Sequence, residues 1–526
     1  MAILDSLFAS SGFSASQYAT SALVLIVGWQ LTTIFYNLYL HPLRNFPGPV
    51  TSRASRIPWA YLHATGVQFL WTQKLHDKYG PVVRIGPNHL SFTDADAWKD
   101  IYGHRLGVES SMQEMPKAQP FYNVIRGVPT SIVTADRDEH QKFRRALSHG
   151  FSDSSMREQE PLIDHYVDLL IKRIHETCDG GQTALNLEAW YNWTTFDIVG
   201  DLVFGQSFDC LENVAYHPWV SFIFKSVRFG SVAVALSYVG LNELVQILFK
   251  INGFMAISKM RLHIRNFLQN RLKSDKERND LFEGIVKRRE EWNVSFEKLS
   301  SNAFILVLAG SETTATTLSG ATYLLLSNPE VLRRLTDEVR SSFNSVTEIN
   351  ISSVNQLTYM LAVLNESLRL YPPVTSSLAR QVPGKGADIA GHYVAGGTFV
   401  EVQHWSINHS TNNWADPWTF DPERFLDGSK TPSDNKLDAL QPFNVGPRNC
   451  IGRNLAYAEM RLILARIIYD FDLKLADESK EWINRQKAFP LVSCHFTVLP
   501  LPLPYPSYGV VFRYVVSFTH VHEVKN

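Results

Sequence analysis

"FNVGPRNCIG", residues 443–452, is the stretch of this chain that decides its fold. It holds Cys450, one of only 4 cysteines in 526 residues, in a loop that also contains an arginine and two glycines. A structural cysteine usually lies among aliphatic residues and behaves as a small hydrophobe. In this loop, free backbone N–H groups and a nearby cation would favour the thiolate over the thiol. The stretch therefore indicates a cysteine with a chemical role.

The composition of the whole chain is that of an ordinary globular protein. Hydrophobic residues make up 45% and charged residues 19%, which is ample material for a core. The 50 basic and 51 acidic side chains give a formal net charge of -1, and this argues against a nucleic-acid-binding protein. The cysteines, at positions 178, 210, 450 and 494, lack metal-binding spacing and are too few for a disulfide-stapled secreted domain. We therefore expect most of the chain to face a reducing compartment.

The N-terminal segment predicts a membrane anchor. No Asp, Glu, Lys or Arg occurs from Ser6 to Leu43, and Tyr18–Leu40 reaches the roughly 20 apolar residues that a bilayer requires. A cleaved signal peptide or a buried core helix is the alternative, but a signal peptide normally has a basic region ahead of its apolar part. Here the basic residues follow, so residues 1–17 are expected in the lumen and the next domain in the cytosol. The prolines within residues 41–50 predict a stiff hinge.

The remainder, residues 51–489, reads as one large domain of mostly helix with minor sheet. Tyr79–Asp94 predicts two short strands around a Gly-Pro turn, and Gly386–Val402 alternates like a small sheet. The longest helix is predicted over Lys298–Leu326, where an Asn-Pro pair stops it. The apolar segment Phe222–Lys250 predicts helices that cover a cavity, lie on a membrane or belong to the core.

The cysteine loop carries a resemblance to a known family. Phe443, Gly446, Arg448, Cys450 and Gly452 stand at the spacing F-x-x-G-x-R-x-C-x-G. A lone cysteine in a glycine loop would more often be structural or a nucleophile, but with this pattern complete the chain resembles the cytochrome P450 haem-thiolate monooxygenases. The resemblance covers almost everything after the hinge. It implies a mainly α fold with small β-sheets, preceded by one transmembrane helix.

The same resemblance implies haem b as the cofactor. Cys450 would be the axial ligand of the iron, and a thiolate is the haem ligand that favours O–O cleavage. Arg448 would pair with a haem propionate, the two glycines would let the loop approach the metal, and Phe443 would also belong to the cofactor-binding set. The segment "HQKFRRAL" has His140 where many relatives have tryptophan, and it keeps Arg144. These two residues and Arg380 are the further propionate contacts that the resemblance implies.

"AGSETT", residues 309–314, lies inside the longest predicted helix. Glycine within a helix costs about 1 kcal/mol relative to alanine, so Gly310 needs a reason. Threonine hydroxyls can bond preceding carbonyls and loosen the turn. A membrane helix is the alternative, but an acid beside two threonines would be expensive in lipid. By resemblance, Thr313 would hold iron-bound dioxygen and its water, and Glu312 would help to deliver protons.

A third motif, "NESLRLYPP", residues 365–373, places Glu366 and Arg369 on one helix face. Such a pair is usually a solvated surface pair worth little, but its apolar neighbours indicate burial. A buried pair needs further partners, and Arg424 in "FDPERF" offers one. The resemblance implies that these three residues form a structural network behind the haem.

Electrons must come from another protein, because the chain has no G-x-G-x-x-G motif for a nicotinamide and little sequence after Cys450 for flavin domains. The resemblance implies NADPH as the source, a separate NADPH–cytochrome P450 reductase as the carrier, and cytochrome b5 as an additional partner. Lys142, Arg145, Arg448 and Arg453 are expected to form a basic docking face. The anchor fits a single-pass protein of the endoplasmic reticulum membrane with a cytosolic catalytic domain.

The amino-acid sequences of the motifs are similar to those of fungal secondary-metabolism enzymes of the isotrichodermin hydroxylase type. We therefore expect oxidation of a lipophilic terpenoid or polyketide, bound between residues 112–130, 222–250 and 374–378. A redox-neutral isomerase is disfavoured, since the Glu312–Thr313 pair is intact. A non-catalytic haem or lipid binder would rest on the atypical tail, residues 490–526, whose Leu-Pro alternation suits polyproline II. We attribute that tail to a misassigned intron or a frameshift.

Overall fold

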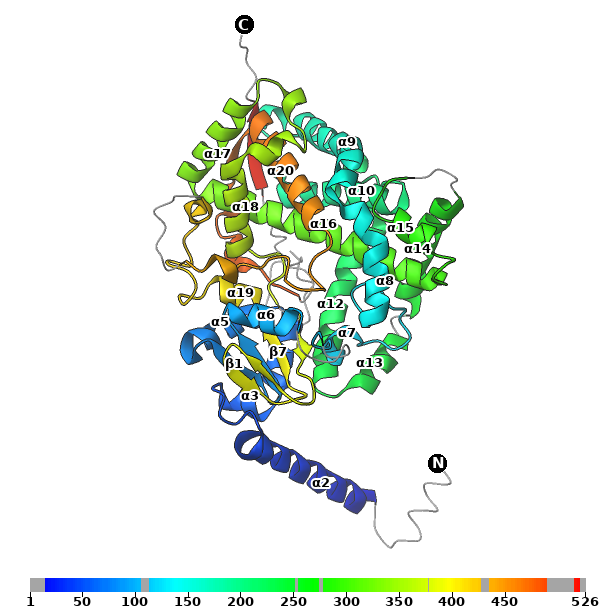
Figure 1. The fold of residues 1–526 in the computed structure, drawn as a ribbon, viewed down its shortest axis with the longest axis vertical. Coiled ribbons are helices and arrows are strands. Elements are labelled where there is room, and N and C mark those ends of the chain that lie inside the picture. The colour runs from blue at the N-terminus through cyan, green and yellow to red at the C-terminus, as the bar shows by residue number, and fades with distance from the viewer. Residues whose placement is uncertain are drawn as a thin grey trace.

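The computed structural model describes residues 15–105, 113–250, 254–273, 278–376, 378–426, 435–489 and 515–520. The fold is mainly α with three small sheets, as predicted (Figure 1). Most of the expected lumenal N-terminus and most of the atypical tail lie outside the described residues.

An apolar helix at the start of the described chain projects from the body of the molecule (Figure 1). α2 (Ala15–Phe35) continues as a π-helical turn, Tyr36–Leu40, and Ser16–Leu40 is long and apolar enough to cross a membrane. Only 6% of its most apolar window is buried, which excludes the buried core helix. Its last turn is tied to α3 (Val50–Ala54), because the Asn37 amide donates to the Ala54 carbonyl at 3.0 Å.

A sheet of four strands lies near the anchor. Its order is β1 (Val82–Gly86), β2 (His89–Phe92), β7 (Phe399–Val402) and β4 (Arg380–Gln381). β2 runs parallel to β7 and the other pairs are antiparallel. The hairpin of β5 (Ala387–Ile389) and β6 (His392–Val394) stands beside it. The two stretches of sequence predicted as sheet thus form all of these strands except β4, which lies outside both.

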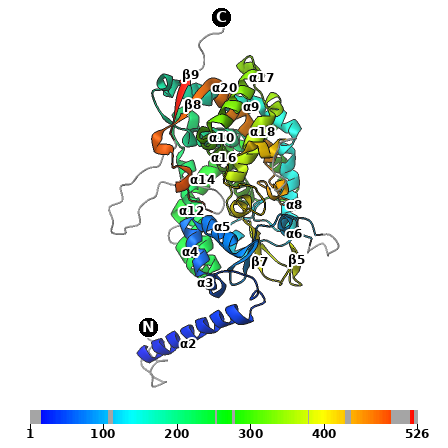
Figure 2. The same ribbon diagram turned by 90° about the vertical axis from the view of Figure 1, so that its left-hand side faces the viewer.

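Helices α4 (Ile57–Thr65), α5 (Gln68–Tyr79) and α6 (Asp96–Tyr102) surround this sheet (Figures 1 and 2). α12 (Pro218–Tyr238) lies along α4, and α13 (Asn242–Leu248) follows it. The apolar segment 222–250 therefore forms helices against the sheet region, and its inner face is buried by side chains such as Val234 and Tyr238.

The helical part of the molecule is built around α16 (Phe296–Ser327), which runs through its centre (Figure 1). α10 (Leu187–Phe204) packs along it so closely that the Tyr191 hydroxyl reaches Thr322 at 2.9 Å. The prediction for this helix was right to within two residues at its start, and Asn328 caps its end. Around it stand α8 (Arg137–Leu147), α9 (Asp153–Thr177), α14 (Phe254–Lys273), α17 (Pro329–Ser342), α18 (Thr358–Leu370) and α20 (Arg453–Asp470). The short helices are α7 (Gln119–Tyr122), α11 (Cys210–Asn213), α15 (Glu283–Lys287) and α19 (His404–Asn408).

The third sheet includes part of the tail. β9 (Val515–His520) lies between β3 (Leu185–Asn186) and β8 (Phe471–Leu475). It pairs antiparallel with β8 from Phe471 opposite His520 to Leu475 opposite Val516. Six residues of the tail therefore belong to the folded domain, while residues 490–514 and 521–526 lie outside the described chain.

Candidate active site

A cavity of about 300 Å³ separates the cysteine loop from the middle of α16. Cys450 lies on one wall, and Ala309, Gly310 and Thr313 of α16 lie on another. The side chains around them are mainly apolar: Ile132, Val133, Val199, Leu281, Ile305, Leu306, Leu308, Leu368, Pro373, Val374 and Leu378. The chain thus encloses a thiol, a threonine and an apolar surface in one space.

Two of the three stretches expected to line the pocket do so. Residues 112–130 contribute Lys117 and Tyr122, and residues 374–378 contribute Val374 and Leu378. Among the described lining residues, none comes from the third expected stretch, residues 222–250. The reason is that the inner face of α12 packs against α4 and the sheet and not against the cavity.

The cysteine loop is shaped by one glycine that no other residue could replace. Gly446 has φ +76°, and a Cβ there would lie 2.0 Å from the carbonyl oxygen of Tyr102. The loop closes when the Cys450 N–H donates to the Phe443 carbonyl at 2.8 Å. α20 begins directly afterwards, at Arg453. The result is a turn that presents Cys450 to the cavity.

The Cys450 side chain is exposed to the cavity although protein surrounds it. Burial raises the pKa of its thiol, and the Gly452 N–H and the charges of Arg144 and Arg453 only partly offset this. This corrects the expectation from the loop alone, since the N–H group and the cations are present but burial outweighs them. A bound metal ion supplies the positive charge that deprotonates a coordinating thiol.

A second end of the cavity is strongly basic. Arg380 is buried, lines the cavity, and its Nη1 has no hydrogen-bond partner among the described residues. Lys117 pairs with Arg380 through the backbone and donates its Nζ to the Val133 carbonyl. Burial and then the charges of Arg448 and Arg380 lower the pKa of Lys117 to about 6. Buried cations without anions are unfavourable, so this end favours an anionic ligand.

The other three predicted propionate contacts also lie here. Arg448 is already paired, because its guanidinium lies 2.8 Å from Glu114 and donates to the Ala135 carbonyl at 2.9 Å. Arg144 donates to the Asn449 carbonyl and, at 2.8 Å, to its side-chain oxygen, so it braces the cysteine loop. Burial and the charges of Arg448 and Lys117 lower the pKa of His140 to about 3, which keeps the imidazole neutral. Arg448 is therefore not part of an exposed docking face, contrary to expectation.

The two residues of the acid–alcohol motif point in different directions. The Thr313 side chain lines the cavity, and its hydroxyl donates to the Ala309 carbonyl at 2.7 Å. Glu312 is buried but is absent from the described cavity wall. The pKa of Glu188 on α10 is raised mainly by the burial of Glu188 and secondly by the negative charge of Glu312. Gly310 has a packing reason, since a Cβ there would lie 3.1 Å from Val199 of α10.

The predicted structural network is assembled and fully buried. Arg369 Nε lies 2.6 Å from one Glu366 oxygen, and Arg424 Nε lies 3.4 Å from the other. Arg369 also donates to the carbonyls of Asn408 and Pro417, at 2.8 and 2.7 Å. The network fastens α18 to the loop that leads toward the cysteine stretch.

Sequence reasoning missed Lys117 and Glu114. Neither belongs to a motif, and both act through partners that are distant in sequence. The sequence offered one signal that these residues matter: they are charged, and they lie in a segment that was expected to line the pocket.

The comparison with protein families decides the identity. The model of the family described as Cytochrome P450 matches residues 57–498, which is most of the chain. The chain belongs to the cytochrome P450 family. This P450 is 49% identical over 485 residues to cytochrome P450 monooxygenase tpeC of Talaromyces stipitatus, with 90% of this chain and 93% of the relative covered.

Two further relatives carry the names of hydroxylases. The trichothecene C-15 hydroxylase of Fusarium sporotrichioides is 40% identical, covering 90% of this P450 and 96% of the relative. The averantin hydroxylase of Dothistroma septosporum is 41% identical, covering 90% and 89%. The P450 is therefore a haem-thiolate monooxygenase of the fungal secondary-metabolism kind, and it uses haem and electrons from a reductase. Its residues fit that cofactor, since the Cys450 thiol lies on one wall of the cavity and Arg380, whose Nη1 has no hydrogen-bond partner among the described residues, lies on another.

Proposed function

We propose that this P450 hydroxylates or otherwise oxidises a terpenoid or polyketide intermediate inside the cavity between Cys450 and α16. The observation that carries the proposal is the apolar cavity wall, interrupted on α16 only by threonines. Such a wall binds a lipophilic molecule and leaves few polar groups to orient it. The relatives named trichothecene C-15 hydroxylase and averantin hydroxylase support a hydroxylation.

We assign the haem contacts as follows. Cys450 would bind the haem iron, and Phe443, Gly446 and Gly452 would shape the loop around it. Arg380, with its unpaired Nη1, would take a propionate directly, and neutral His140 would donate a hydrogen bond from its ring. When bound, the haem supplies the activation of O2 and the transfer of one oxygen atom to the substrate.

Thr313 and Glu312 would manage protons by a relay and not as one catalytic pair. The Thr313 hydroxyl faces the cavity, where it can hold a water molecule. Glu312 is buried behind it, near Glu188 of α10, where it would help to deliver protons. Consecutive helical residues are about 100° apart, and of these two only Thr313 lies on the described cavity wall.

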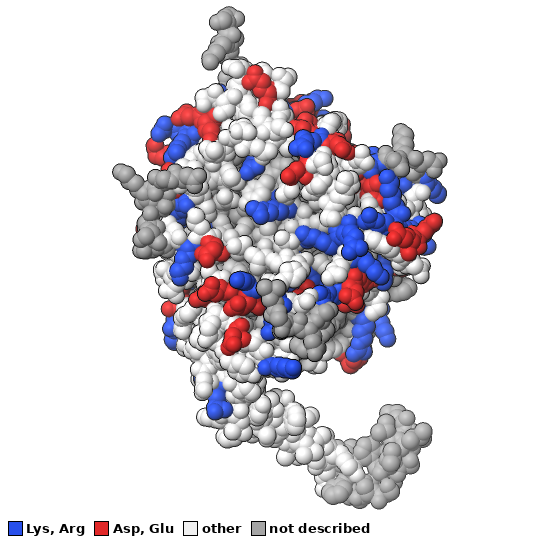
Figure 3. Space-filling model, viewed as in Figure 1, with Lys and Arg blue, Asp and Glu red and all other residues white. Residues whose placement is uncertain are grey.

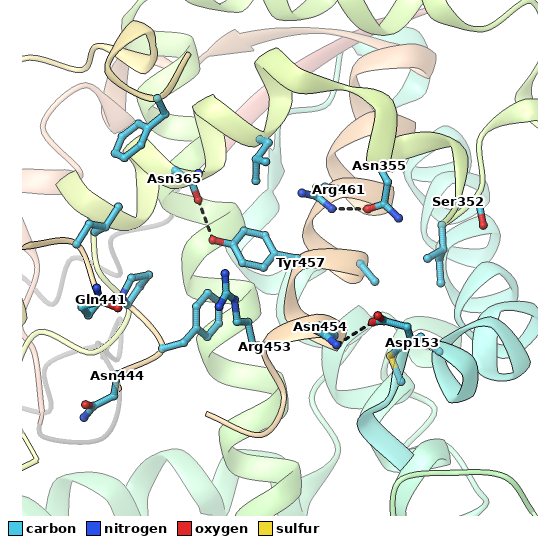
Figure 4. Close-up of a pocket in the computed structure, with 18 of the residues that line it drawn as sticks. Asp153, Ser352, Asn355, Asn365, Gln441, Asn444, Arg453, Asn454, Tyr457 and Arg461 are labelled. Atoms are coloured by element: carbon cyan, nitrogen blue, oxygen red, sulfur yellow. Dashed lines mark hydrogen bonds between the residues drawn. The ribbon is translucent and has the colours of Figure 1, made fainter. Parts of the chain in front are cut away.

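A groove behind the cysteine loop suits the reductase. Figure 4 shows Arg453, Tyr457 and Arg461 of α20 pointing into it, with Asp153 at one edge. Three arginines (157, 453 and 461) and one acid line this groove, whose volume is about 660 Å³ and whose wall includes Phe443. Basic side chains also gather over α8 on the same face (Figure 3), where Lys142 and Arg145 are exposed. Complementary charge would steer an acidic flavoprotein to the site nearest the haem.

The proposed setting is the endoplasmic reticulum membrane, with Tyr18–Leu40 as a single anchor and the catalytic domain in the cytosol. The exposed apolar helix and the basic residues after it support this orientation. Cytochrome b5, a second electron carrier of that membrane, would use the same basic groove.

The test is turnover in microsomes that contain the full chain and its reductase. A panel of terpenoids and aromatic polyketides is incubated with NADPH under ¹⁸O2, and a product that gains one ¹⁸O atom is expected. A product formed without NADPH would favour the redox-neutral alternative. NADPH consumption that never yields an oxygenated product from either substrate class would overturn the proposal.

A further inference from the structure

Residues 129–135 form a strap between α7 and α8 that carries part of the active-site wall. The strap lies outside every described helix and strand, so its backbone N–H and C=O groups need partners from elsewhere. Ile132 and Val133 of the strap line the cavity that Cys450 faces. The positions of these two side chains therefore depend on what holds the strap.

Two adjacent residues near the start of α16 hold the strap. The side-chain oxygen of Asn302 accepts from the Ile132 N–H at 2.9 Å, and the Ser301 hydroxyl donates to the Pro129 carbonyl at 2.9 Å. Asn302 is 0% exposed, and its amide nitrogen donates to the Lys298 carbonyl at 2.9 Å. This second bond fixes the orientation of the amide, because an amide nitrogen can only donate and its oxygen can only accept.

The same helix also lines the cavity. Ile305 and Leu306 belong to its wall, and each lies four residues after one member of the Ser301–Asn302 pair. Residues four apart lie on the same face of a helix, one above the other. The two hydrogen bonds thus hold the strap at a fixed distance from the part of α16 that a bound molecule would touch.

The far part of the strap is held at the basic end of the cavity. Lys117 donates its Nζ to the Val133 carbonyl, and Arg448 donates to the Ala135 carbonyl at 2.9 Å. Replacing either cation would also disturb the end of the cavity that favours an anionic ligand. Ser301 and Asn302 are absent from the described cavity wall, so their replacement acts on the cavity through the strap.

We propose that Asn302 and Ser301 are positioning residues, which fix the strap to α16 and thereby set the room that a bound molecule has beside Ile132 and Val133. Without the Asn302 oxygen, the Ile132 N–H is buried and lacks its partner, which is unfavourable. The strap then moves until this group reaches water, and the two apolar side chains move with it. The effect on bound molecules rests on the proposed function, because it needs haem in the cavity, but the attachment of the strap does not.

The attachment is tested by hydrogen–deuterium exchange of the full chain in detergent, followed by mass spectrometry. Asn302→Leu has nearly the shape of asparagine without its polar atoms, and exchange of the Ile132 amide should become at least about tenfold faster. Asn302→Asp keeps an accepting oxygen and should exchange like the wild type. Ser300→Ala is the matched control, since the Ser300 hydroxyl donates to the Phe296 carbonyl within α16. Equal exchange in Asn302→Leu and Ser300→Ala would overturn the proposal.

The room in the cavity is tested with two probes, imidazole and 1-phenylimidazole, each of which changes the haem spectrum when its nitrogen binds the iron. In Asn302→Leu and Ser301→Ala the ratio of the two dissociation constants should change several-fold, while the affinity for imidazole stays that of the wild type. Asn302→Asp and Ser300→Ala should keep the wild-type ratio. A purely structural role predicts an unchanged ratio, with both affinities falling together if folding suffers, and that result would overturn the positioning role.

The two tests separate this inference from the proposed function. If even the wild type shows no spectral change with either probe, haem is not accessible in the cavity, and the proposed function and the effect on bound molecules fail together. The exchange rates of Asn302→Leu and Ser300→Ala would still decide whether α16 holds the strap.

Discussion

At the scale of single residues, the site depends on groups whose charge is not balanced within the protein. Cys450 is presented by a loop that the sequence identifies, but burial keeps its thiol protonated until a cation binds. Arg380 keeps a buried Nη1 that has no hydrogen-bond partner in the described part of the chain. The sequence motifs predicted that Cys450, Arg448, Arg380, His140 and Arg144 lie around one site. They could not predict that Arg448 is paired with Glu114, because that contact joins segments more than 300 residues apart.

The unpaired arginine gives a prediction about cofactor retention. Arg380→Met should weaken haem binding roughly 10- to 100-fold, because a charge-assisted hydrogen bond is worth about 1.5–3 kcal/mol. The measurement is the rate of haem transfer from the purified protein to an excess of apomyoglobin. Arg333→Met, on the exposed surface of α17, is the matched control. Equal transfer rates for the two variants would show that Arg380 does not contact the cofactor.

At the scale of elements, the long helix shows what periodicity can and cannot give. The sequence predicted the bounds of α16 closely and placed Gly310 inside the helix. The assignment of roles to Glu312 and Thr313 needed the direction of each side chain. Only Thr313 lines the cavity, because the other face of the helix is covered by α10. The reason for Gly310, close contact with Val199, is likewise a property of the packed pair of helices.

The network that fastens α18 gives a prediction about stability. Arg369→Ala leaves the carboxylate of Glu366 buried beside Arg424 alone, and breaking a buried pair costs about 3–5 kcal/mol. We expect a much lower yield of folded protein, and most of that protein should lack haem. Thermal unfolding followed by haem absorbance measures the effect. Arg333→Ala, which breaks an exposed pair, should change stability by at most about 1 kcal/mol, and a similar loss in both variants would contradict the structural role.

At the scale of the whole molecule, the anchor, the sheet region and the groove define an orientation. α2 leaves from the end of the molecule that carries the sheet, away from the body (Figure 1). The five N-x-S/T sequons, at Asn192, Asn293, Asn350, Asn365 and Asn408, all lie in the catalytic domain. A cytosolic domain predicts that none is glycosylated in microsomes. A shift in mass after treatment with an endoglycosidase would place the domain in the lumen.

The basic groove gives a prediction about electron transfer. The double variant Arg157→Glu, Arg453→Glu should reduce the rate of reduction by the reductase several-fold at low salt, because steering charges act mainly on association. The difference should shrink as ionic strength rises. Stopped-flow reduction under carbon monoxide measures the rate, with Arg333→Glu as the control. If the double variant and the control behave alike, the reductase docks elsewhere.

The large-scale fold was largely predictable, because a specific motif identified a family with one architecture. The contribution of the tail was not. Its residues 515–520 complete a sheet with β3 and β8, a pairing between parts of the chain that local sequence cannot reveal. The hypothesis of a misassigned intron still rests on the sequence of residues 490–526, and the transcript across the codons for residues 486–494 tests it.

Cys450 is expected to bind haem iron as a thiolate in the intact, anchored chain. The most direct measurement is the reduced carbon-monoxide difference spectrum of the full-length protein in membranes, beside Cys450→His. We expect a strongly red-shifted Soret band for the wild type, and a band at the position of imidazole-ligated haem for the variant. A wild-type band at that unshifted position, or no bound haem, would show that Cys450 is not a thiolate ligand of the iron.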